Sequence, residues 1–404
     1  MAPPLEGLRV LDLSTGIAGP YSTKILADYG ARVVKVEQPS TGDQARREGP
    51  FPGDVPHPEK SGLFLFLNTG KEGVTLNMET ITGRDLFHRL IGEVDVLVES
   101  FPPSRSEALG ISYDELSEHN PELVLTSITD FGRDGPRRDH KLTDMAAFAS
   151  TGFVYPMGEA DRPPVRPGGP FAGFITGLYG CFATLMAYLE ALATGQGQQV
   201  DVSMQEVILS AVIYDTTASS YSGQVRKRQG NWYHQDAGIG LSIQPTKDGH
   251  IGFLVGPGYE RWRTLWEVLL GRPEVLEDER FETPEGMREN GRELEAIAQS
   301  VLKGQNSEEL FHEAQALRLL FGQILTMKDL FHNKHLRARG YFQPVHHPEL
   351  GQVELPGLPW RFSETPAENL KAAPTLGQHN RDVYSELLEM EPADLTRLGA
   401  AGII

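Results

Sequence analysis

The stretch LRVLDLSTGIAGPYSTKILADYGARVVKVEQ, from Leu8 to Gln38, decides the fold. It begins with a short apolar run, Leu8 to Ser14, and ends with a second one that starts at Ala31. Between them lie the turn TGIAGP and a segment whose apolar residues recur at four-residue spacing. A buried strand, a tight turn, a helix and another buried strand are typical of a parallel βαβ unit. The stretch therefore predicts an α/β protein with a parallel sheet.

The same alternation continues to about residue 130. DLFHRLIGEV has the pattern of a helix, and VDVLVESF and PELVLTSIT have the pattern of buried strands. Further on, TGQGQQVDVSMQEVILSAV predicts a turn, a strand and a helix. Repeated alternation places crossover helices on both faces of the sheet. We expect a Rossmann-like architecture.

A change of composition marks a second, smaller domain. The polar, basic segment SGQVRKRQGNWYHQDAGIG precedes HIGFLVG, a predicted strand, and YERWRTLWEVLL, a predicted amphipathic helix. This domain extends to about Asp329, and the tail then shows extended runs, turn chemistry in PELGQVELPG and a helix, VYSELLEM. We interpret this part as a small α+β domain.

Charge and cysteine content exclude several classes. The chain has 37 basic and 55 acidic residues and a net charge of −18, which argues against nucleic-acid and anionic-membrane partners. Its one cysteine, Cys181, excludes an intramolecular disulfide framework and suits a reducing cytoplasm, and the first residues lack the pattern of a signal peptide. Phe171 to Leu189 is uncharged and long enough to span a membrane. We expect it to be a buried helix in a large core or an oligomer interface, in a cytoplasmic protein.

The turn after the first strand has two interpretations. Gly16 and Gly19 follow a strand and open a helix, and Glu37 lies about 20 residues further on, as a ribose-binding acid would. The glycine spacing is G-x-x-G rather than G-x-G-x-x-G, so the pyrophosphate cradle is incomplete. A tight strand-to-helix turn that needs small residues is the favoured interpretation.

Metal and nucleophile motifs are absent from the sequence. His332 and His335, and the adjacent pair His346 and His347, lack carboxylates at a recognised ligand spacing, so we expect no metal site. Cys181 lies in the apolar helix, where a thiol stays protonated. Two basic clusters remain as phosphate-binding candidates or solvated loops: Arg133, Arg137, Arg138 and Lys141, and residues 226–228.

Five segments in order resemble a known family. LDLSTGIAGPYSTKILADYGARVVKVEQPSTGD is similar to the N-terminal signature of the family III coenzyme A transferases, the CaiB/BaiF type. The others are N-x-x-K at Asn68 to Lys71, G-R-D-G-P from Gly132, TGQGQQVDVSM from Thr194, and RARGYF with HPELGQVELPG near the C-terminus. The resemblance covers essentially the whole chain.

The resemblance implies a domain plan and an assembly. It predicts a large Rossmann-like domain built from both chain ends, a smaller inserted α+β domain, and two subunits interlocked as a dimer. On this chain we expect the first part of the large domain at 1–204, a linker helix at 205–224, the small domain at 225–329, and a linker with the return to the large domain at 330–404.

It also implies a chemistry. Active members move coenzyme A from an acyl-CoA to a free acid, and an aspartate attacks the donor thioester as a covalent nucleophile. The coenzyme A thioester is a co-substrate, and no tightly bound cofactor or metal is expected. Five residues match positions that contact coenzyme A in relatives: Ala18, Gln38, Lys71, Phe101 and Lys141. Gln38 stands where an arginine often stacks on adenine, Ser100 replaces a frequent asparagine, and Pro102 replaces a frequent arginine.

The sequence departs from the family at the nucleophile. The aspartate normally stands four residues before a glycine at the start of the apolar helix, and here Gly173 precedes Gly177 at that spacing. The racemase branch uses a histidine before an acidic residue, and here Thr143 precedes Asp144. Gly173 and Gly177 instead form a predicted close-packing pair.

We therefore expect the non-nucleophilic subunit of a heteromeric CoA-transferase, with a paralogous, aspartate-bearing partner. The chain resembles the aspartate-lacking subunit of succinyl-CoA:benzylsuccinate transferase of anaerobic aromatic degradation. Two alternatives stay open. One is a homomeric acyl-CoA lyase, hydratase or isomerase that uses Asp144, Glu159 or Asp161, and the other is a non-catalytic CoA-binding protein.

Overall fold

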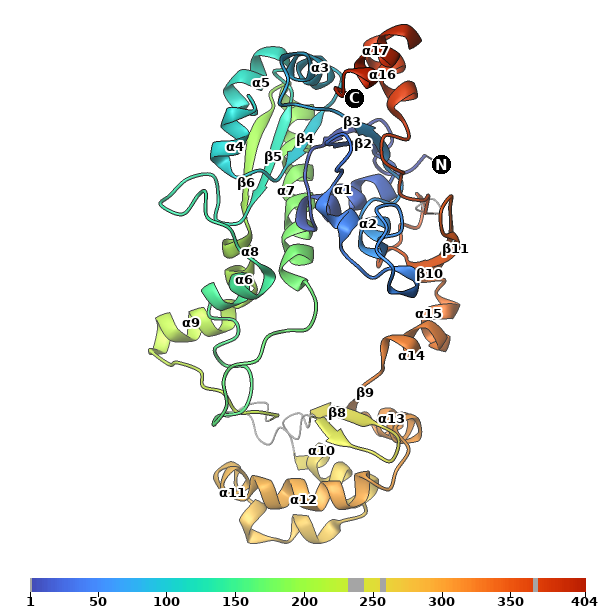
Figure 1. Cartoon of the computed structure of the whole chain (residues 1–404). Helices are drawn as coiled ribbons and strands as arrows, with labels where there is room; N and C mark the ends of the chain where they lie inside the picture. Colours follow the sequence, from blue (N-terminus) through green and yellow to red (C-terminus); the bar gives the residue numbers. More distant parts are fainter. Residues whose placement is uncertain (1, 232–242, 255–258, 366–369) are drawn as a thin grey trace. The chain divides into compact units, whose positions relative to one another are not determined.

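The computed structural model describes residues 2–231, 243–254, 259–365 and 370–404, which divide into two compact units (Figure 1). The large unit combines Met1–Phe153, Arg166–Gln224 and His335–Ile404, so it contains both chain ends. The small unit combines Val154–Val165 and Val225–Lys334.

A six-stranded parallel sheet forms the centre of the large unit, with the strand order β3-β2-β1-β4-β5-β6. This is the order of the doubly wound, Rossmann-type sheet, and it confirms the predicted fold class. The strands are β1 (Arg9–Asp12), β2 (Arg32–Glu37), β3 (Glu72–Thr75), β4 (Val96–Glu99), β5 (Val124–Thr129) and β6 (Gln198–Ser203).

Helices cover both faces of this sheet. On one face, α1 (Ala18–Asp28), α7 (Phe171–Thr194) and α8 (Met204–Ala211) enclose a core that includes Val10, Val33 and Val98. On the other, helices enclose a core around Leu11, Val34 and Leu97: α3 (Ile81–Ile91), α5 (Tyr113–His119) and α16 (Asn380–Leu388). Neighbouring residues of one strand point to opposite faces, so each apolar strand contributes to both cores.

The other elements of the large unit are short. They are α2 (Gly62–Leu67), α4 (Pro103–Ala108), α6 (Asp144–Ser150), α9 (Ile213–Ser222), α17 (Pro392–Ala400), the 3₁₀ turns η1 (Gln44–Arg47) and η2 (Pro52–Asp54), and the antiparallel pair β10 (Phe342–His347) and β11 (Gly351–Pro356). Helix α15 (Lys334–Ala338) joins the two units along the chain.

The C-terminal segment completes the outer edge of the sheet beside β3. The backbone N–H of Gly73 donates to His379 Nδ1 at 2.9 Å, and that of Thr75 donates to Asn380 Oδ1 at 2.8 Å. The buried Tyr384 hydroxyl donates to the Thr75 carbonyl at 2.8 Å. Side chains from the end of the chain thus satisfy the edge strand.

The small unit has its own core. Its antiparallel sheet has the order β7-β8-β9 and packs with helices around the fully buried Trp266. Its elements are β7 (Ile243–Pro245), β8 (His250–Leu254), β9 (Leu320–Gln323), α10 (Tyr259–Arg263), the π-helical turn η3 (Thr264–Leu269), the 3₁₀ turns η4 (Pro273–Leu276) and η5 (Glu279–Phe281), α11 (Pro284–Glu289), α12 (Gly291–Leu302), α13 (Ser307–Ala316) and α14 (Met327–His332).

Two sequence expectations differ from this arrangement. The loop 154–165, which we placed in the large domain, belongs to the small unit because Gly230 N donates to Gly158 O at 2.8 Å and Arg228 Nη1 to Tyr155 O at 3.2 Å. The predicted helix 259–270 is interrupted, since α10 passes into a π-helical turn. The last two residues of the predicted strand HIGFLVG, and the second half of the basic segment before it, lie outside the described residues.

Helix α7 is long and apolar enough to cross a membrane by length and composition. One of its faces is buried against α1 and the sheet, and small residues such as Gly177, Gly180 and Ala187 line it. The opposite face is exposed, so α7 is not buried all round. A core helix of this kind meets the same length and composition criterion as a membrane span.

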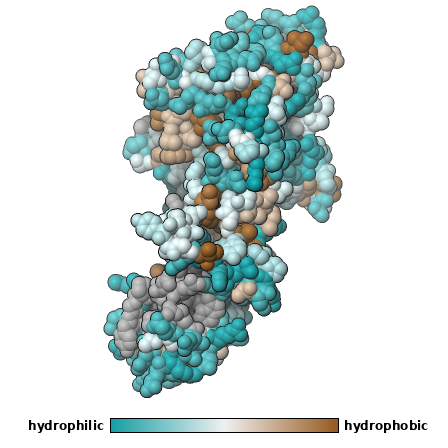
Figure 2. Space-filling view, turned by 90° about the vertical axis from the view of Figure 1, so that its left-hand side faces the viewer, coloured by the Kyte–Doolittle hydropathy of each residue, from teal (hydrophilic) through white to brown (hydrophobic). Residues whose placement is uncertain are grey.

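Figure 2 shows one face of the molecule, on which hydrophilic side chains predominate. Hydrophobic side chains reach this surface in separate patches.

Candidate functional site at the carboxyl edge of the sheet

A buried ionic cluster supports the turn after β1. The Asp12 carboxylate accepts from Ser14 N at 3.0 Å, Thr23 Oγ1 at 2.7 Å and Lys71 Nζ at 3.0 Å. Burial alone would raise the pKa of Asp12, but the ammonium groups of Lys35 and Lys71 outweigh it and hold this pKa well below its usual range. The turn is therefore held in place by buried ionised groups.

Lys35 and Asp43 extend this cluster along β2. Lys35 Nζ lies 3.0 Å from Asp43 Oδ2, and Asp43 Oδ1 accepts from Gly16 N at 3.0 Å. Burial lowers the pKa of Lys35, yet the Asp12 and Asp43 carboxylates outweigh it and raise the pKa overall. The glycine turn is thus bonded to protein groups on its inner side.

The structure favours the tight-turn interpretation of Gly16 and Gly19. Gly16 has a φ of +79°, and a Cβ at Gly19 would lie 2.1 Å from Ser14 Cβ, so both positions need glycine. Glu37 does not offer its carboxylate to a ribose, because it is buried and forms a paired contact to Arg46 at 2.7 and 2.8 Å.

Lys71 lies in the ionic cluster rather than on a surface. Its Nζ donates to Asp12 Oδ2 at 3.0 Å, Pro20 O at 2.9 Å and Asn68 Oδ1 at 2.8 Å, which uses all three N–H groups of an ammonium. Burial lowers the pKa of Lys71 to about 8, although Asp12 opposes this. A contact from Lys71 to coenzyme A would therefore need the ammonium to leave these partners.

Gln38 and Phe101, two of the predicted contact residues, line one cavity. It has a volume of about 110 Å³ and lies past the carboxyl ends of β2 and β4, with apolar walls that include Leu76, Met78 and Leu109. Ligands of open α/β sheets bind at this edge, where the strand order reverses. The cavity is large enough for part of a nucleotide-bearing ligand, not for the whole molecule.

Two charged residues at the carboxyl edge of the sheet escaped the sequence analysis, and only the second lines this cavity. Glu99 ends β4, is fully buried, and its Oε2 accepts from Phe101 N at 2.7 Å while Oε1 lies 3.2 Å from Arg133 Nη1. Burial raises the pKa of Glu99. Arg105 of α4 lines the same cavity and is paired with Glu79. A glutamate that ends an otherwise apolar strand was the available signal for Glu99.

Ala18 and Lys141 lie apart from this cavity. Ala18 is buried in the first turn of α1, where its carbonyl faces Gly177 of α7. Lys141 is exposed in the segment that precedes α6. Ser100 Oγ accepts from Thr15 N at 2.9 Å, so the serine supports the turn.

The position implied for the nucleophile, Gly173, lies in the first turn of α7. A Cβ built there would meet Ile17 Cβ and Cγ2, each at 2.9 Å, and one at Gly177 would lie 2.4 Å from Ala18 O. The two glycines therefore act as the predicted close-packing pair between α1 and α7.

Asp144 is the carboxylate that the structure brings to Gly173. Its Oδ1 accepts from Ala172 N at 2.7 Å, and its Oδ2 is enclosed without a hydrogen-bond partner among the described residues. Burial raises the pKa of Asp144. Thr143, at the racemase position, caps α6 through Ala146 N at 3.3 Å. Glu159 and Asp161 lie in the loop of the small unit, where both are exposed.

The remaining candidates are arginine, histidine and cysteine side chains, and some of them have protein partners. Arg138 pairs with Glu107 at 2.9 Å, and the described histidines form no group of three metal ligands with other residues of the described chain. Cys181 is buried, and burial raises its pKa to about 12. The Cys181 thiol therefore stays protonated, while Arg137 in the 132–141 loop is exposed.

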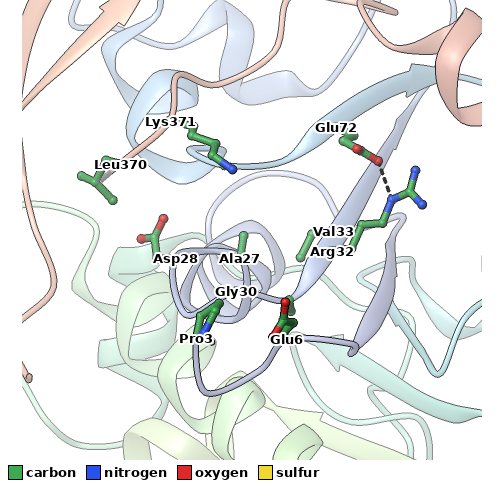
Figure 3. A pocket seen from close by; sticks show the side chains of 12 residues that line it. Pro3, Glu6, Ala27, Asp28, Gly30, Arg32, Val33, Glu72, Leu370 and Lys371 are labelled. Carbon is green, nitrogen blue, oxygen red and sulfur yellow. Dashed lines mark hydrogen bonds and ion pairs between the residues drawn. The ribbon is translucent and has the colours of Figure 1, made fainter. Parts of the chain in front are cut away.

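A larger cavity, about 290 Å³, lies at the opposite edge, where β2 and β3 begin (Figure 3). Three of its charged side chains have protein partners: Arg32 Nε lies 3.0 Å from Glu72, and Asp28 accepts from Thr69 Oγ1 at 3.0 Å. It contains none of the predicted contact residues. We place the functional site at the carboxyl edge, because α/β sheets bind ligands there.

The fold and this edge define a doubly wound α/β protein with an inserted small domain. A family model described as CoA-transferase family III matches residues 5–380. The chain belongs to this family.

Relatives and a solved structure agree with the assignment. The chain is 31% identical over 403 residues to succinyl-CoA–D-citramalate CoA-transferase of Chloroflexus aurantiacus, covering 99% of this chain and 98% of the relative. It is 31% identical over 407 residues to subunit BbsE of succinyl-CoA:(R)-benzylsuccinate CoA-transferase of Thauera aromatica, covering 97% of each. A crystal structure of a CAIB/BAIF family protein from Brucella suis superposes with a TM-score of 0.85 at 29% identity, covering 96% of this chain and 100% of that one.

Proposed function

We propose that this chain is the non-nucleophilic subunit of a heteromeric CoA-transferase that moves coenzyme A from succinyl-CoA to a carboxylic acid. The observation that carries the proposal is Gly173, which has no side chain at the position where the family resemblance implies an aspartate. The lone chain should therefore lack transferase activity.

In this proposal a paralogous partner subunit supplies the aspartate. Its carboxylate attacks the thioester carbonyl, the C–S bond breaks, and a mixed anhydride and the coenzyme A thiolate form. The thiolate then attacks the aspartyl carbonyl of the anhydride and releases succinate. The acceptor carboxylate attacks the carbonyl of this aspartyl-CoA thioester and expels the thiolate, which gives a second mixed anhydride. The thiolate then attacks the acceptor's carbonyl in this anhydride, so the aspartate is released and the acceptor leaves as its CoA ester. The donor is a co-substrate, and no tightly bound cofactor or metal is needed.

Two features support a second subunit. The BbsE relative carries the word subunit in its name. In this chain, the exposed face of α7 carries a stripe of large apolar side chains at helical spacing, 45–65% exposed: Leu178, Phe182, Met186, Leu189 and Leu192. Such a stripe is typical of a surface that a partner protein covers. By similarity to BbsE we propose a benzylsuccinate as acceptor, and by the charge and cysteine content a cytoplasmic location.

The test is co-expression of this chain with a paralogue that bears D-x-x-x-G at the matching position. The purified complex and each chain alone are assayed for exchange between succinyl-CoA and candidate acids. We expect activity in the complex and none in this chain alone. Full activity of this chain by itself would overturn the proposal, and stable complexes without turnover would favour a non-catalytic binding protein.

One observation favours a second candidate, a homomeric acyl-CoA enzyme that uses Asp144. Its carboxylate lies at the first turn of α7 beside Gly173, and one oxygen has no hydrogen-bond partner in the part of the chain that the structure describes. Asp144→Asn, which keeps the shape and one acceptor, should abolish activity of the lone chain if Asp144 reacts. Glu159→Gln in the small unit is the matched control. An inactive wild-type chain excludes this candidate.

A further inference from the structure

The cavity of about 110 Å³ at the carboxyl edge has two cationic side chains among the described residues that line it, Lys35 and Arg105. They differ in how freely they could meet a ligand. Lys35 is fully buried, and its Nζ lies 3.0 Å from Asp43 Oδ2 in the ionic cluster behind the turn after β1. Arg105 is partly exposed, so its guanidinium is the group that an anionic ligand in this cavity can reach.

The ion pair of Arg105 with Glu79 joins segments that follow two different strands. Arg105 lies in α4, which comes shortly after β4, and Glu79 lies between β3 and α3. Strands β2 and β1 stand between β3 and β4 in the sheet, so the pair bridges the edge at which all four strands end. The two side chains are 44% and 53% exposed, and an ion pair that water reaches contributes little to stability. Arg105 can therefore exchange Glu79 for another anion at little cost.

The loop that follows β5 holds α4 in place. Asp139 Oδ1 accepts from Ser104 N at 2.8 Å, and Arg138 Nη1 lies 2.9 Å from Glu107 Oε1. These two contacts flank Arg105 in the sequence of the helix. The backbone that carries Arg105 is thus fixed, and a change of partner needs only a rotation of its side chain.

We propose that Arg105 binds a phosphate group of the ligand in this cavity, and that Glu79 competes with that phosphate for the guanidinium. The proposal rests on the proposed function for the identity of the ligand, a coenzyme A thioester, which carries a 3′-phosphate and a diphosphate. A guanidinium donates two parallel hydrogen bonds to a phosphate, and these charge-assisted bonds are stronger than neutral ones. The apolar walls around Leu76, Met78 and Leu109 suit the base of the same nucleotide.

Isothermal titration calorimetry of the full chain with coenzyme A tests this contact. Arg105→Gln should weaken binding about tenfold or more, because it removes charge-assisted hydrogen bonds to the phosphate. Glu79→Gln should strengthen binding several-fold, because it frees Arg105 and removes a negative charge near the phosphate. An ion pair with a purely structural role would give effects of the same sign. Effects of the same sign, no effect of Arg105→Gln, or no binding of coenzyme A by the wild-type chain would each overturn the proposal.

Arg9 and Asp95 provide a matched control pair. They form an ion pair at the opposite edge of the sheet, with 2.8 Å between Arg9 Nη2 and Asp95 Oδ1, and the Arg9 side chain is 45% exposed. Arg9→Gln and Asp95→Asn change the net charge as the test variants do and should leave the affinity for coenzyme A unchanged. If Arg9→Gln weakened binding as much as Arg105→Gln, the effect would be one of overall charge and the proposal would be overturned.

Titration with 3′-dephospho-coenzyme A identifies which phosphate Arg105 binds. If it binds the 3′-phosphate, Arg105→Gln has no effect on the affinity for this analogue, and if it binds the diphosphate, the loss is as large as with coenzyme A. Transfer by the complex with the aspartate-bearing paralogue is assayed separately. If the affinities change as expected but the complex transfers no coenzyme A, the contact stands and the proposed function fails.

Discussion

Lys71 shows how a residue in a recognisable motif can serve the fold. Its ammonium is fully buried and bonds Asp12, Pro20 and Asn68. Removing one partner of a buried ion pair leaves an uncompensated charge, so Lys71→Met should lower the free energy of unfolding by about 3–5 kcal/mol, measured by urea denaturation. The exposed Lys303→Met should leave it unchanged. If Lys71 acted only as a ligand contact, stability would be kept and coenzyme A affinity lost.

Cys181 gives a prediction for pH. Burial raises its pKa from 9.0 to about 12, so the unfolded chain loses the thiol proton first. The contribution of Cys181 to stability is therefore present below pH 9 and is lost as pH rises from 9 towards 12. Compared with Cys181→Ser, the wild type should lose stability over this range in urea titrations. At pH 8 the folded chain should not react with a disulfide reagent, and the unfolded chain should react fully; rapid reaction of the folded chain would contradict the burial.

For single residues, the sequence predicts what a glycine position can do better than it predicts contacts between residues far apart in the chain. The missing side chain at Gly173 and the tight turn at Gly19 could be inferred from short patterns, because glycine limits what a position can do. The contact of Gly173 with Ile17, and that of Lys71 with Asp12, join residues far apart in the chain. No periodicity encodes such contacts, so the burial of Lys71 and the close approach of Gly173 to Ile17 could not be predicted.

Among the elements, α7 offers the sharpest test of association. Leu189 is 65% exposed on its outer face, so Leu189→Glu should not disturb the core of this chain but should place a charge in the proposed subunit contact. We expect unchanged thermal unfolding and loss of the complex with the aspartate-bearing paralogue in size-exclusion chromatography. Ile81→Glu is the control, because it makes the same apolar-to-charged change at a residue of α3 that is 81% exposed. Complex formation by the Leu189 variant would place the partner elsewhere.

Many of the elements that local patterns predicted are strongly apolar. Strands β1, β2, β4 and β5 and helix α1 fall within the predicted segments, since each is apolar enough to be buried on its own. Strand β3, EGVT, was not predicted because it is four residues long and includes a glycine. Its place at the edge depends on the C-terminal segment, which no local pattern reveals.

The large and small units have separate cores, which predicts two unfolding events. Phe87 lies in a core of the large unit and Trp266 in that of the small unit, and both are fully buried. Replacement of a buried aromatic residue by alanine costs about 3–5 kcal/mol. In differential scanning calorimetry we expect Trp266→Ala to shift one transition and Phe87→Ala the other. A single transition that both variants shift equally would contradict independent cores.

The use of the last residues to finish the outer strand of the sheet has a consequence for biosynthesis. On the side of β3 away from β2, Gly73 and Thr75 bond to His379, Asn380 and Tyr384. On the ribosome, β3 is made early, and its outer N–H and C=O groups stay open while the inserted unit is translated. Until the C-terminal segment is made, β3 is thus an edge strand with unpaired backbone groups. A nascent chain can pair with a neighbouring chain at such a strand. A truncated transcript or a stalled ribosome would yield a chain that has most of its core residues and lacks the C-terminal segment that bonds to β3.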